Sequence, residues 1–157
     1  MNNTIKYIKV GCLFLVSIIL GFVRERTFIT INNRLKDIRK SSDYTEFETW
    51  LLFLKELDPQ TLYMLKWILT PGFAIVFMLL TITVSKVYFE SNKYNYLVSF
   101  VFLSIFVVAI SGYGIGYLIG AENKAYTFSR FFMGLIQSPF ILVFIIPAFS
   151  LLEKQKQ

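Results

Sequence analysis

This chain contains no histidine and a single cysteine, Cys12, among its 157 residues. Histidine is the commonest metal ligand and the usual general base near neutral pH, so its absence removes both roles. One cysteine can form neither an internal disulfide nor a cysteine cluster for a metal. Cys12 lies among aliphatic residues, and we expect it to behave as a small buried apolar residue. We therefore expect no metal site and no cofactor.

Charged residues are also scarce, at 17% of the chain, against roughly 25% in ordinary globular proteins. Hydrophobic residues make up 55% and aromatic residues 18%, which is more than a water-soluble core of this size can hold. The apolar residues fall into four blocks, each long enough to cross a bilayer, which takes about 20 residues as a helix. The blocks run from about residues 7–23, 62–84, 96–119 and 131–152.

None of the four blocks contains an acidic residue, and Lys9 and Lys66 lie close enough to the end of a block to snorkel. We therefore do not expect a relay of carboxylates that carries protons through the membrane. The serines in the blocks have no visible base, and no glycine-rich phosphate loop occurs in the context that a nucleotide site requires. The residue types thus argue against an enzyme.

The four blocks predict an all-α membrane protein, with a single membrane domain over residues 1–157 and four transmembrane helices. The connections after the second and third blocks are short, so consecutive helices should be antiparallel neighbours in an up-down bundle. The one substantial extramembrane segment is the helical loop between the first and second blocks, at about residues 24–61.

Within this loop, Thr45 and Glu48 have the spacing of a capping box. They predict a short amphipathic helix with apolar residues at helical intervals, closed by Asp58 and Pro59. Such a helix could lie in the membrane interface. It could equally well pack against the membrane helices of the same chain.

The first block has a second possible interpretation as a cleaved signal peptide, because Lys6 and Lys9 provide a basic region before its most apolar part. No small-x-small cleavage site follows, since the next residues are Arg24, Glu25 and Arg26. We therefore expect an anchor that is not cleaved.

The net charge of +6 comes from basic residues at the ends of the blocks, where anionic headgroups favour them. We therefore expect no nucleic-acid partner. A count of nearby Lys and Arg leans slightly toward a cytoplasmic long loop. Against this, the loop balances seven basic residues with seven acidic ones between Arg24 and Asp58, whereas the basic residues of the opposite side are all lysine. We expect both termini to be cytoplasmic.

Small residues recur every fourth position in the third block, at Gly112, Gly116 and Gly120, and the fourth block has Gly134 and Ser138 at the same spacing. This spacing places small residues on one face of a helix, so that another helix can approach closely. We expect the third and fourth helices to pack through these faces. The alternatives are a homodimer contact or a groove that admits lipid or substrate beside Tyr113 and Tyr117.

Prolines interrupt two blocks, at Pro71 in the second and at Pro139 and Pro147 in the fourth. Each removes a helical hydrogen bond and should kink its helix. Gln137 and Ser138, beside Pro139, form the most polar pair within any block. They predict either a ligand-binding position or a hydrogen-bonded contact between helices.

A charged set at one membrane face is the most suggestive feature of the sequence. Arg24, Glu25 and Arg26 leave the first helix on the side where Arg130 enters the fourth. An ion pair between Arg130 and Glu25 would make the position of Arg130 tolerable. Arg24 or Arg26 could then hold a lipid phosphate or a partner's carboxylate bidentately. Simple interfacial anchoring is the other interpretation of this set.

Two stretches resemble an uncharacterised group of small four-span inner-membrane proteins of Bacteroidota-type bacteria. They are Gly21-Phe-Val-Arg-Glu and Ser129-Arg-Phe-Phe-Met-Gly-Leu-Ile-Gln-Ser-Pro, the latter continuing to Ile146-Pro-Ala-Phe149. The resemblance covers nearly the whole chain. It implies a location in the bacterial inner membrane and brings no activity.

Two functions remain open from the sequence. The first is a non-enzymatic accessory or scaffold subunit of a membrane complex, whose partners would be the lipid bilayer and either a second copy of itself or a larger membrane protein. The second is a small oligomeric transporter or lipid-binding membrane protein that uses the kinked helices and the arginine face.

Overall fold

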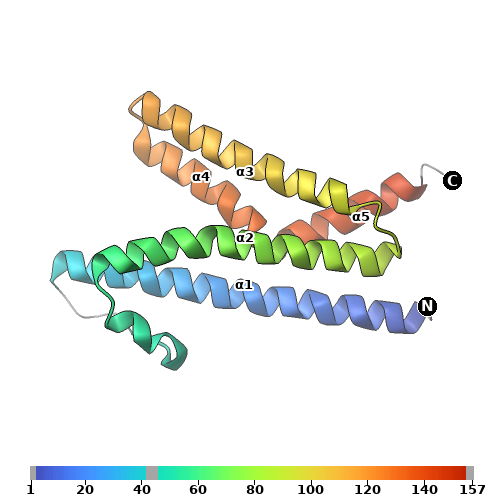
Figure 1. The fold of residues 1–157 in the computed structure, drawn as a ribbon, viewed down its shortest axis with the longest axis horizontal. Helices are drawn as coiled ribbons and strands as arrows, with labels where there is room; N and C mark the ends of the chain where they lie inside the picture. The colour runs from blue at the N-terminus through green and yellow to red at the C-terminus, as the bar shows by residue number, and fades with distance from the viewer. Residues whose placement is uncertain (1–2, 42–45, 155–157) are drawn as a thin grey trace.

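The structure is a computed structural model that describes residues 3–41 and 46–154. Within these stretches every regular element is helical and no strand occurs, which confirms the all-α prediction. In chain order the elements are α1 (Asn3–Lys40), the 3-10 helix η1 (Thr49–Lys55), α2 (Pro59–Phe89), α3 (Asn95–Leu118), α4 (Glu122–Ile136) and α5 (Phe140–Lys154), as Figure 1 shows.

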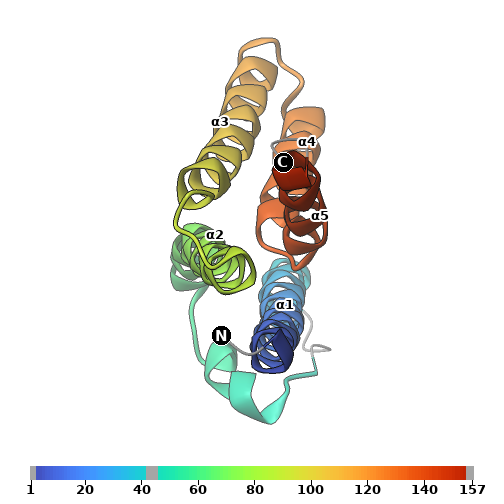
Figure 2. The same cartoon turned by 90° about the vertical axis from the view of Figure 1, so that its right-hand side faces the viewer.

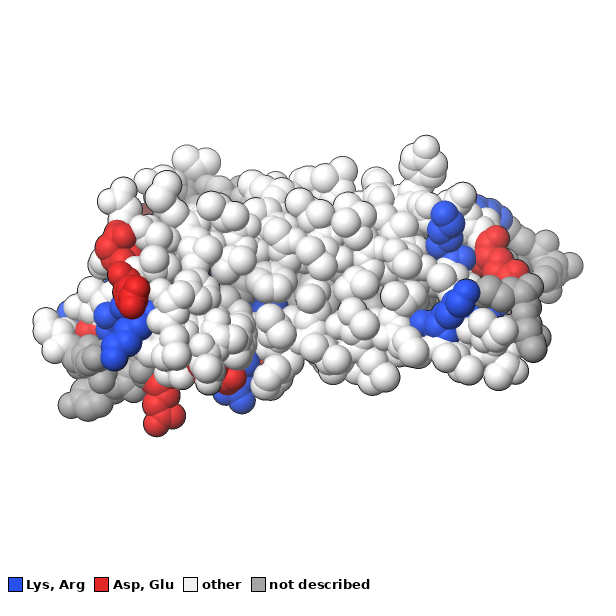
Figure 3. All heavy atoms as spheres, turned by 60° about the horizontal axis from the view of Figure 1, so that its bottom comes forward, with Lys and Arg blue, Asp and Glu red and all other residues white. Residues whose placement is uncertain are grey.

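Three helices, α1, α2 and α3, are each long and apolar enough to cross a membrane. The pair α4 and α5 makes a fourth span if the two helices cross as one, although they meet at a bend of 62°. On the face shown in Figure 3, charged side chains gather toward the two ends and leave a broad band with few charges between them. These features fit an integral membrane protein.

Helices α1 to α4 run in alternating directions, as an up-down bundle requires, and α5 continues toward the same end as α4 (Figure 1). Both termini and the α2–α3 turn lie at one end, which we call the lysine end after Lys6, Lys9, Lys86 and Lys93. There an ion pair of 3.6 Å between Lys6 and Glu90 joins the beginning of α1 to the end of α2. Seen from the lysine end, α1 and α2 lie below α3 and α4 (Figure 2).

Helix α1 continues well beyond the predicted first span. It is 38 residues long, or about 57 Å, which is nearly twice the thickness of about 30 Å of a hydrocarbon core. The predicted loop from residue 24 is therefore helical as far as Lys40, because no proline or glycine interrupts it. Cys12, which we expected to be buried, is exposed on α1.

Asp58 and Pro59 begin α2, which corrects the prediction that they only close the preceding helix. The Asp58 carboxylate accepts hydrogen bonds from the backbone N–H groups of Gln60 at 3.0 Å and Thr61 at 3.1 Å. Proline suits the first helical position because its missing N–H would have no partner there. Thr45, which the capping-box spacing predicted as the N-cap of the short helix, lies outside the described residues.

The short element between α1 and α2 is a 3-10 helix that packs against both of them. Its residues Leu51 and Leu54 are buried in a small apolar core with Ile31 and Leu35 of α1 and Leu62 of α2. The structure therefore confirms one of the two predicted roles of this segment, which is packing against the helices of the same chain.

The predicted fourth span is two helices rather than one. Helix α4 begins at Glu122 and ends at Ile136, and α5 begins at Phe140. Pro139 lies in the break because proline lacks the N–H that would continue the helix and restricts the residue before it. Helix α2 continues through Pro71, and α5 through Pro147.

Helices α3 and α4 form a close pair through Gly112 and Gly116. A Cβ atom on Gly116 would clash with Ala125, and one on Gly112 would clash with the ring of Phe128. A larger residue at Gly116 would press on the backbone of α4, and one at Gly112 would require the Phe128 ring to move. The two helices therefore approach closely at these glycines, as the spacing of small residues predicts.

Gly120 and Gly134 lie outside this helix contact, which corrects the sequence-based expectation for both. Gly120 ends α3 with a φ of +71°, where glycine carries no Cβ penalty. The backbone N–H of Ala121 donates to the carbonyl of Gly116 at 2.8 Å, as in a Schellman motif. Gly134 faces α1 instead of α3, since a Cβ atom there would lie 3.9 Å from Nη2 of Arg24.

Candidate functional site

A hydrogen-bonded link centred on Arg24 joins three parts of the bundle. Nε and Nη2 of Arg24, on α1, both donate to Oε1 of Gln137, at 3.1 and 2.9 Å. Nε2 of Gln137 then donates to the backbone carbonyl of Thr70 on α2 at 2.7 Å. Gln137 lies in the α4–α5 break and is 1% exposed. The break thus places a buried amide between a cation and a helix carbonyl.

A second link, centred on Lys66, joins the same helices nearer to the end opposite the lysine end. Nζ of Lys66, on α2, donates to Oδ1 of Asn32 on α1 at 2.9 Å. It also donates to the hydroxyl of Tyr126 on α4 at 3.3 Å. Lys66 and Thr70 are one helical turn apart, so the two links are adjacent levels of one polar contact.

Arg130 is the third cation at this contact. It follows Tyr126 by one turn of α4 and precedes Gln137 by two, which places it between the two links along the helix. Its side chain is exposed, and both Arg130 and Glu25 lie within electrostatic range of Arg24. We call Arg24, Lys66 and Arg130 the cation cluster.

Two members of the cation cluster, Arg24 and Lys66, have neutral hydrogen-bond partners. The ion pairs of Lys6 with Glu90 and of Arg26 with Glu48 include no member of the cluster. The groups that hold Arg24 and Lys66 are amides and a phenol. These dipoles orient the cations without neutralising them.

Helix geometry places the cluster near one edge of the apolar band. Along α1, Arg24 is about 22 Å from Lys9, and along α2, Lys66 is about 30 Å from Lys86. With the lysines at one membrane surface, Lys66 reaches the far boundary of a hydrocarbon core of about 30 Å. Arg24 lies about 8 Å, or about one and a half helical turns, inside that boundary.

Aromatic and small side chains surround Arg24. Its guanidinium carbon lies 5.2 Å from the centroid of the Phe28 ring, and Phe28 contacts Phe73 of α2 at a centroid distance of 6.1 Å. Gly21 lets α1 approach the break closely, since a Cβ atom there would lie 3.2 Å from Cδ of Pro139.

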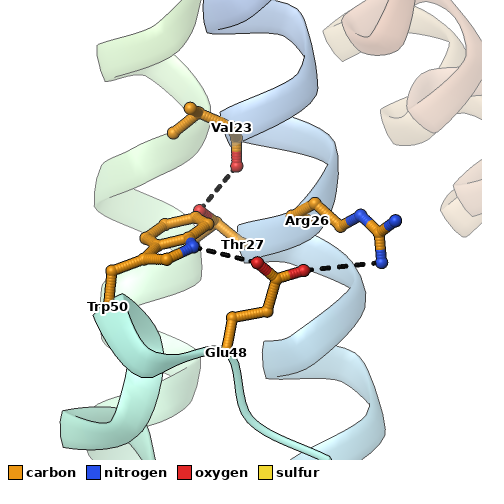
Figure 4. Close-up of polar contacts among 5 residues, drawn as sticks. All are labelled: Val23, Arg26, Thr27, Glu48 and Trp50. Atoms are coloured by element: carbon orange, nitrogen blue, oxygen red, sulfur yellow. Dashed lines mark hydrogen bonds and ion pairs between the residues drawn. The ribbon is translucent and has the colours of Figure 1, made fainter.

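Only part of the predicted site comes together around Arg24. Arg24 and Gln137 are bonded and Arg130 is near them, whereas Arg26 lies on another face of α1. Positions two apart on a helix do not face the same side. Arg26 forms an ion pair of 3.5 Å with Glu48 (Figure 4), and its guanidinium carbon lies 5.0 Å from the Phe22 ring centroid.

Two further expectations for the site are corrected. Within the described residues, no ion pair joins Arg130 to Glu25. The hydroxyl of Ser138 donates to the carbonyl of Leu135 in its own helix at 2.8 Å, so Ser138 takes no part in the Arg24 link.

Sequence reasoning missed Lys66 together with its partners Asn32 and Tyr126. We interpreted Lys66 as a residue that snorkels to the membrane surface. An available signal was that Lys66 is the one charged residue within the second apolar block, because an ionisable residue in a membrane segment is a functional candidate by default.

Comparison of the chain with known protein families, with curated proteins and with solved structures found no match. The chemistry of the site must therefore be inferred from its own groups. Guanidinium and ammonium groups that face amides and a phenol at a membrane edge are donors for an anion. A phosphate group matches them best, because its oxygens accept charge-assisted hydrogen bonds from several cations at once.

Proposed function

We propose that this chain is a non-enzymatic integral membrane protein of the bacterial inner membrane that binds the phosphate group of an anionic lipid at the cation cluster. The observation that carries the proposal is the presence of three cations at one membrane edge, two of which have neutral hydrogen-bond partners. None of the three forms an ion pair within the part of the chain that the structure describes. Positive charge is costly there unless it is matched by negative charge. A lipid phosphate lies just outside this boundary, within reach of long basic side chains that extend toward the headgroups.

The three cations have different parts in such a site. Arg24 and Lys66 are fixed by Gln137, Asn32 and Tyr126, so little side-chain entropy is lost when an anion binds between them. Arg130 is exposed and can reach the phosphate from the outer side. Glu25 reduces the positive potential near Arg24 without removing it.

The test compares Arg130→Gln with Arg26→Gln in purified protein, by native mass spectrometry with phosphatidylglycerol. Arg130→Gln should reduce bound lipid about tenfold, the effect of one lost charge-assisted hydrogen bond. Arg26→Gln is the matched control, because Arg26 is paired with Glu48 on another face. Equal lipid retention in wild type and Arg130→Gln would contradict the proposal.

Inorganic phosphate provides the second arm of this experiment. If millimolar phosphate displaces the lipid, and itself binds in a manner that depends on Arg130, the ligand is a soluble phosphate compound rather than a lipid. If phosphate has no effect, the acyl chains contribute to binding, as expected for a lipid that lies against Phe28 and the neighbouring apolar surface.

A second candidate function is an accessory or scaffold subunit, and α1 provides the observation in its favour. Only 6% of the most apolar window of α1 is buried within the protein, so most of this helix is available to a partner. A photo-crosslinking residue in place of Ile19, which is 63% exposed, should capture a larger membrane protein or a second copy in native membranes. Capture of lipid alone would contradict this role.

We also propose that both termini are cytoplasmic. The basic residues of the lysine end resemble those of ordinary cytoplasmic tails, whereas the opposite end carries basic and acidic residues in similar number. This orientation places the cation cluster at the outer leaflet of the inner membrane. A reporter fused after Gln157 should be active in the cytoplasm, and activity on the other side would reverse the orientation.

A further inference from the structure

The 3-10 helix η1 has an outer apolar surface in addition to its buried one. Leu51 and Leu54 are 1% and 0% exposed, whereas Trp50 is 45% and Phe53 57% exposed. A 3-10 helix has three residues per turn, so positions 50 and 53 share one edge and positions 51 and 54 another. The third edge carries Leu52, which is 51% exposed, together with the exposed polar residues Thr49 and Lys55. The edge of Trp50 and Phe53, with Leu52 beside it, is therefore the apolar outer surface of η1.

Two contacts fix η1 at a defined level along α1. Glu48, just before η1, pairs with Arg26 (Figure 4). At the other end, Nη2 of Arg34 donates to the backbone carbonyl of Lys55 at 3.1 Å. Asn32 lies between these two arginines and binds Lys66 of α2. Helix η1 is therefore level with Lys66, where the hydrocarbon boundary lies.

Other exposed aromatic residues occupy the same level. Trp67 follows Lys66 directly and is 75% exposed, Tyr126 binds Lys66, and Tyr63 lies one turn away on α2. Trp and Tyr gather at the headgroup level of membrane proteins because their rings are amphipathic. Helix α1 has no Trp or Tyr between residues 24 and 40. The outer edges of η1 provide the aromatic surface on that side.

We propose that η1 is a membrane-interface element whose outer residues Trp50, Leu52 and Phe53 insert into the headgroup boundary of the bilayer that the protein spans. The indole N–H of Trp50 donates to Oε2 of Glu48 at 3.1 Å (Figure 4). The polar edge of the ring therefore has a partner within the protein while its apolar part enters the lipid.

The test measures the depth of Trp50 by fluorescence quenching. The chain has two tryptophans, so Trp67→Phe leaves Trp50 as the only one, and Trp67 is exposed enough to be replaced without loss of packing. The variant is reconstituted into phosphatidylcholine and phosphatidylglycerol vesicles. Lipids brominated near the headgroup should quench Trp50 at least twofold more than lipids brominated near the chain end, and aqueous iodide should quench it weakly.

The matched control is Trp50→Phe, which leaves Trp67 as a reference at the same depth. Similar quenching profiles for the two variants support the proposal. If iodide quenches Trp50 as strongly as free tryptophan while brominated lipids do not, the outer surface of η1 faces water and the proposal is wrong. Strongest quenching of Trp50 by bromine near the chain end would also overturn the proposed depth. Lipid binding at the cation cluster is independent of either result.

Discussion

Gln137 bonds the α4–α5 break to both α1 and α2. Gln137→Leu keeps the volume of the side chain and removes both its bond to Arg24 and its bond to the carbonyl of Thr70. Since this leaves a cation without its partner at the membrane edge, we expect a loss of about 3 kcal/mol in unfolding free energy. Thermal unfolding in detergent measures it.

Two variants distinguish loss of this link from a general loss of packing. Ser138→Ala alters the adjacent residue, whose hydroxyl bonds only within its own helix, and should have little effect. Arg24→Met combined with Gln137→Leu removes both partners and should be more stable than Gln137→Leu alone, because an apolar pair leaves no unsatisfied charge. If the double variant is less stable than Gln137→Leu, the loss in Gln137→Leu does not come from leaving the Arg24 charge without its hydrogen-bond partner.

Asp58, the N-cap of α2, makes the start of this helix sensitive to acid. Hydrogen bonds from the Thr61 hydroxyl and from backbone N–H groups lower the pKa of the Asp58 carboxyl below its ordinary value. The folded-state pKa is depressed, so the stabilisation is present above the unfolded pKa of about 3.9. It is lost as pH falls through the lower, folded pKa.

The corresponding variants are Asp58→Ala and Asp58→Asn. Asp58→Ala should lower the thermal midpoint by a few degrees at pH 7, and its difference from wild type should vanish as the carboxyl is protonated. Asp58→Asn retains a capping oxygen that does not titrate. It should therefore keep most of the stability at pH 7 and also at acidic pH, where the Asp58 carboxyl of the wild type is protonated. A difference between wild type and Asp58→Ala that does not shrink as the pH falls through the lowered pKa of this carboxyl would show that its charge is not responsible.

At the scale of single residues, the sequence identified polar side chains that stand out against apolar surroundings. Arg24 and Gln137 were found in this way, and they are bonded across 113 positions of the chain. Their pairing was not predicted, because it depends on which faces of α1 and α4 meet. Arg26 was wrongly grouped with Arg24 because adjacency in sequence does not give proximity on a helix.

The contact between α3 and α4 depends on Gly116, because the backbones of the two helices approach closely there. Gly116→Ala would place a methyl group against both Cβ and the backbone Cα of Ala125, and backbone cannot rotate away as a side chain can. We expect the two helices to separate and the unfolding free energy to fall by about 1 to 3 kcal/mol. Gly114→Ala is the matched control on the same helix, since nothing lies within 4 Å of a Cβ atom there. Equal losses from both substitutions would contradict a close contact at Gly116.

Among the elements, α2 and α3 were predicted within a few residues because hydrophobic runs of that length have one structural solution in a membrane. The end of α1 and the beginning of α4 were not predicted. Both helices extend into charged sequence, where the burial of residues such as Ile31 and Ala125 stabilises the helix. Hydropathy reports solubility in lipid and does not detect this packing.

The whole molecule combines an up-down bundle with a polar contact near one end. Short connections were sufficient to predict the order and direction of the helices. Pro139 predicted a kink in the fourth span, but not that the span divides into two helices with a bend of 62°, because proline allows either a kinked helix or two helices. The bend turns Gln137 toward α1, so the irregular backbone of the α4–α5 break creates the link to Arg24. Gln137 is buried within the protein, as irregular backbone within a membrane span requires.

The depth and direction of the bundle can be tested with single cysteines in a Cys12→Ser background. Lys36 lies about 40 Å from Lys9 along α1, beyond a hydrocarbon core of about 30 Å, whereas Ile19 lies about 15 Å from it. With cytoplasmic termini, a charged maleimide added to intact spheroplasts should label Lys36→Cys and spare both Ile19→Cys and Lys93→Cys. Disruption of the membrane should expose Lys93→Cys and leave Ile19→Cys unlabelled. The reverse pattern at Lys36 and Lys93 would invert the orientation, and labelling of both from one side would contradict a bundle that crosses the membrane.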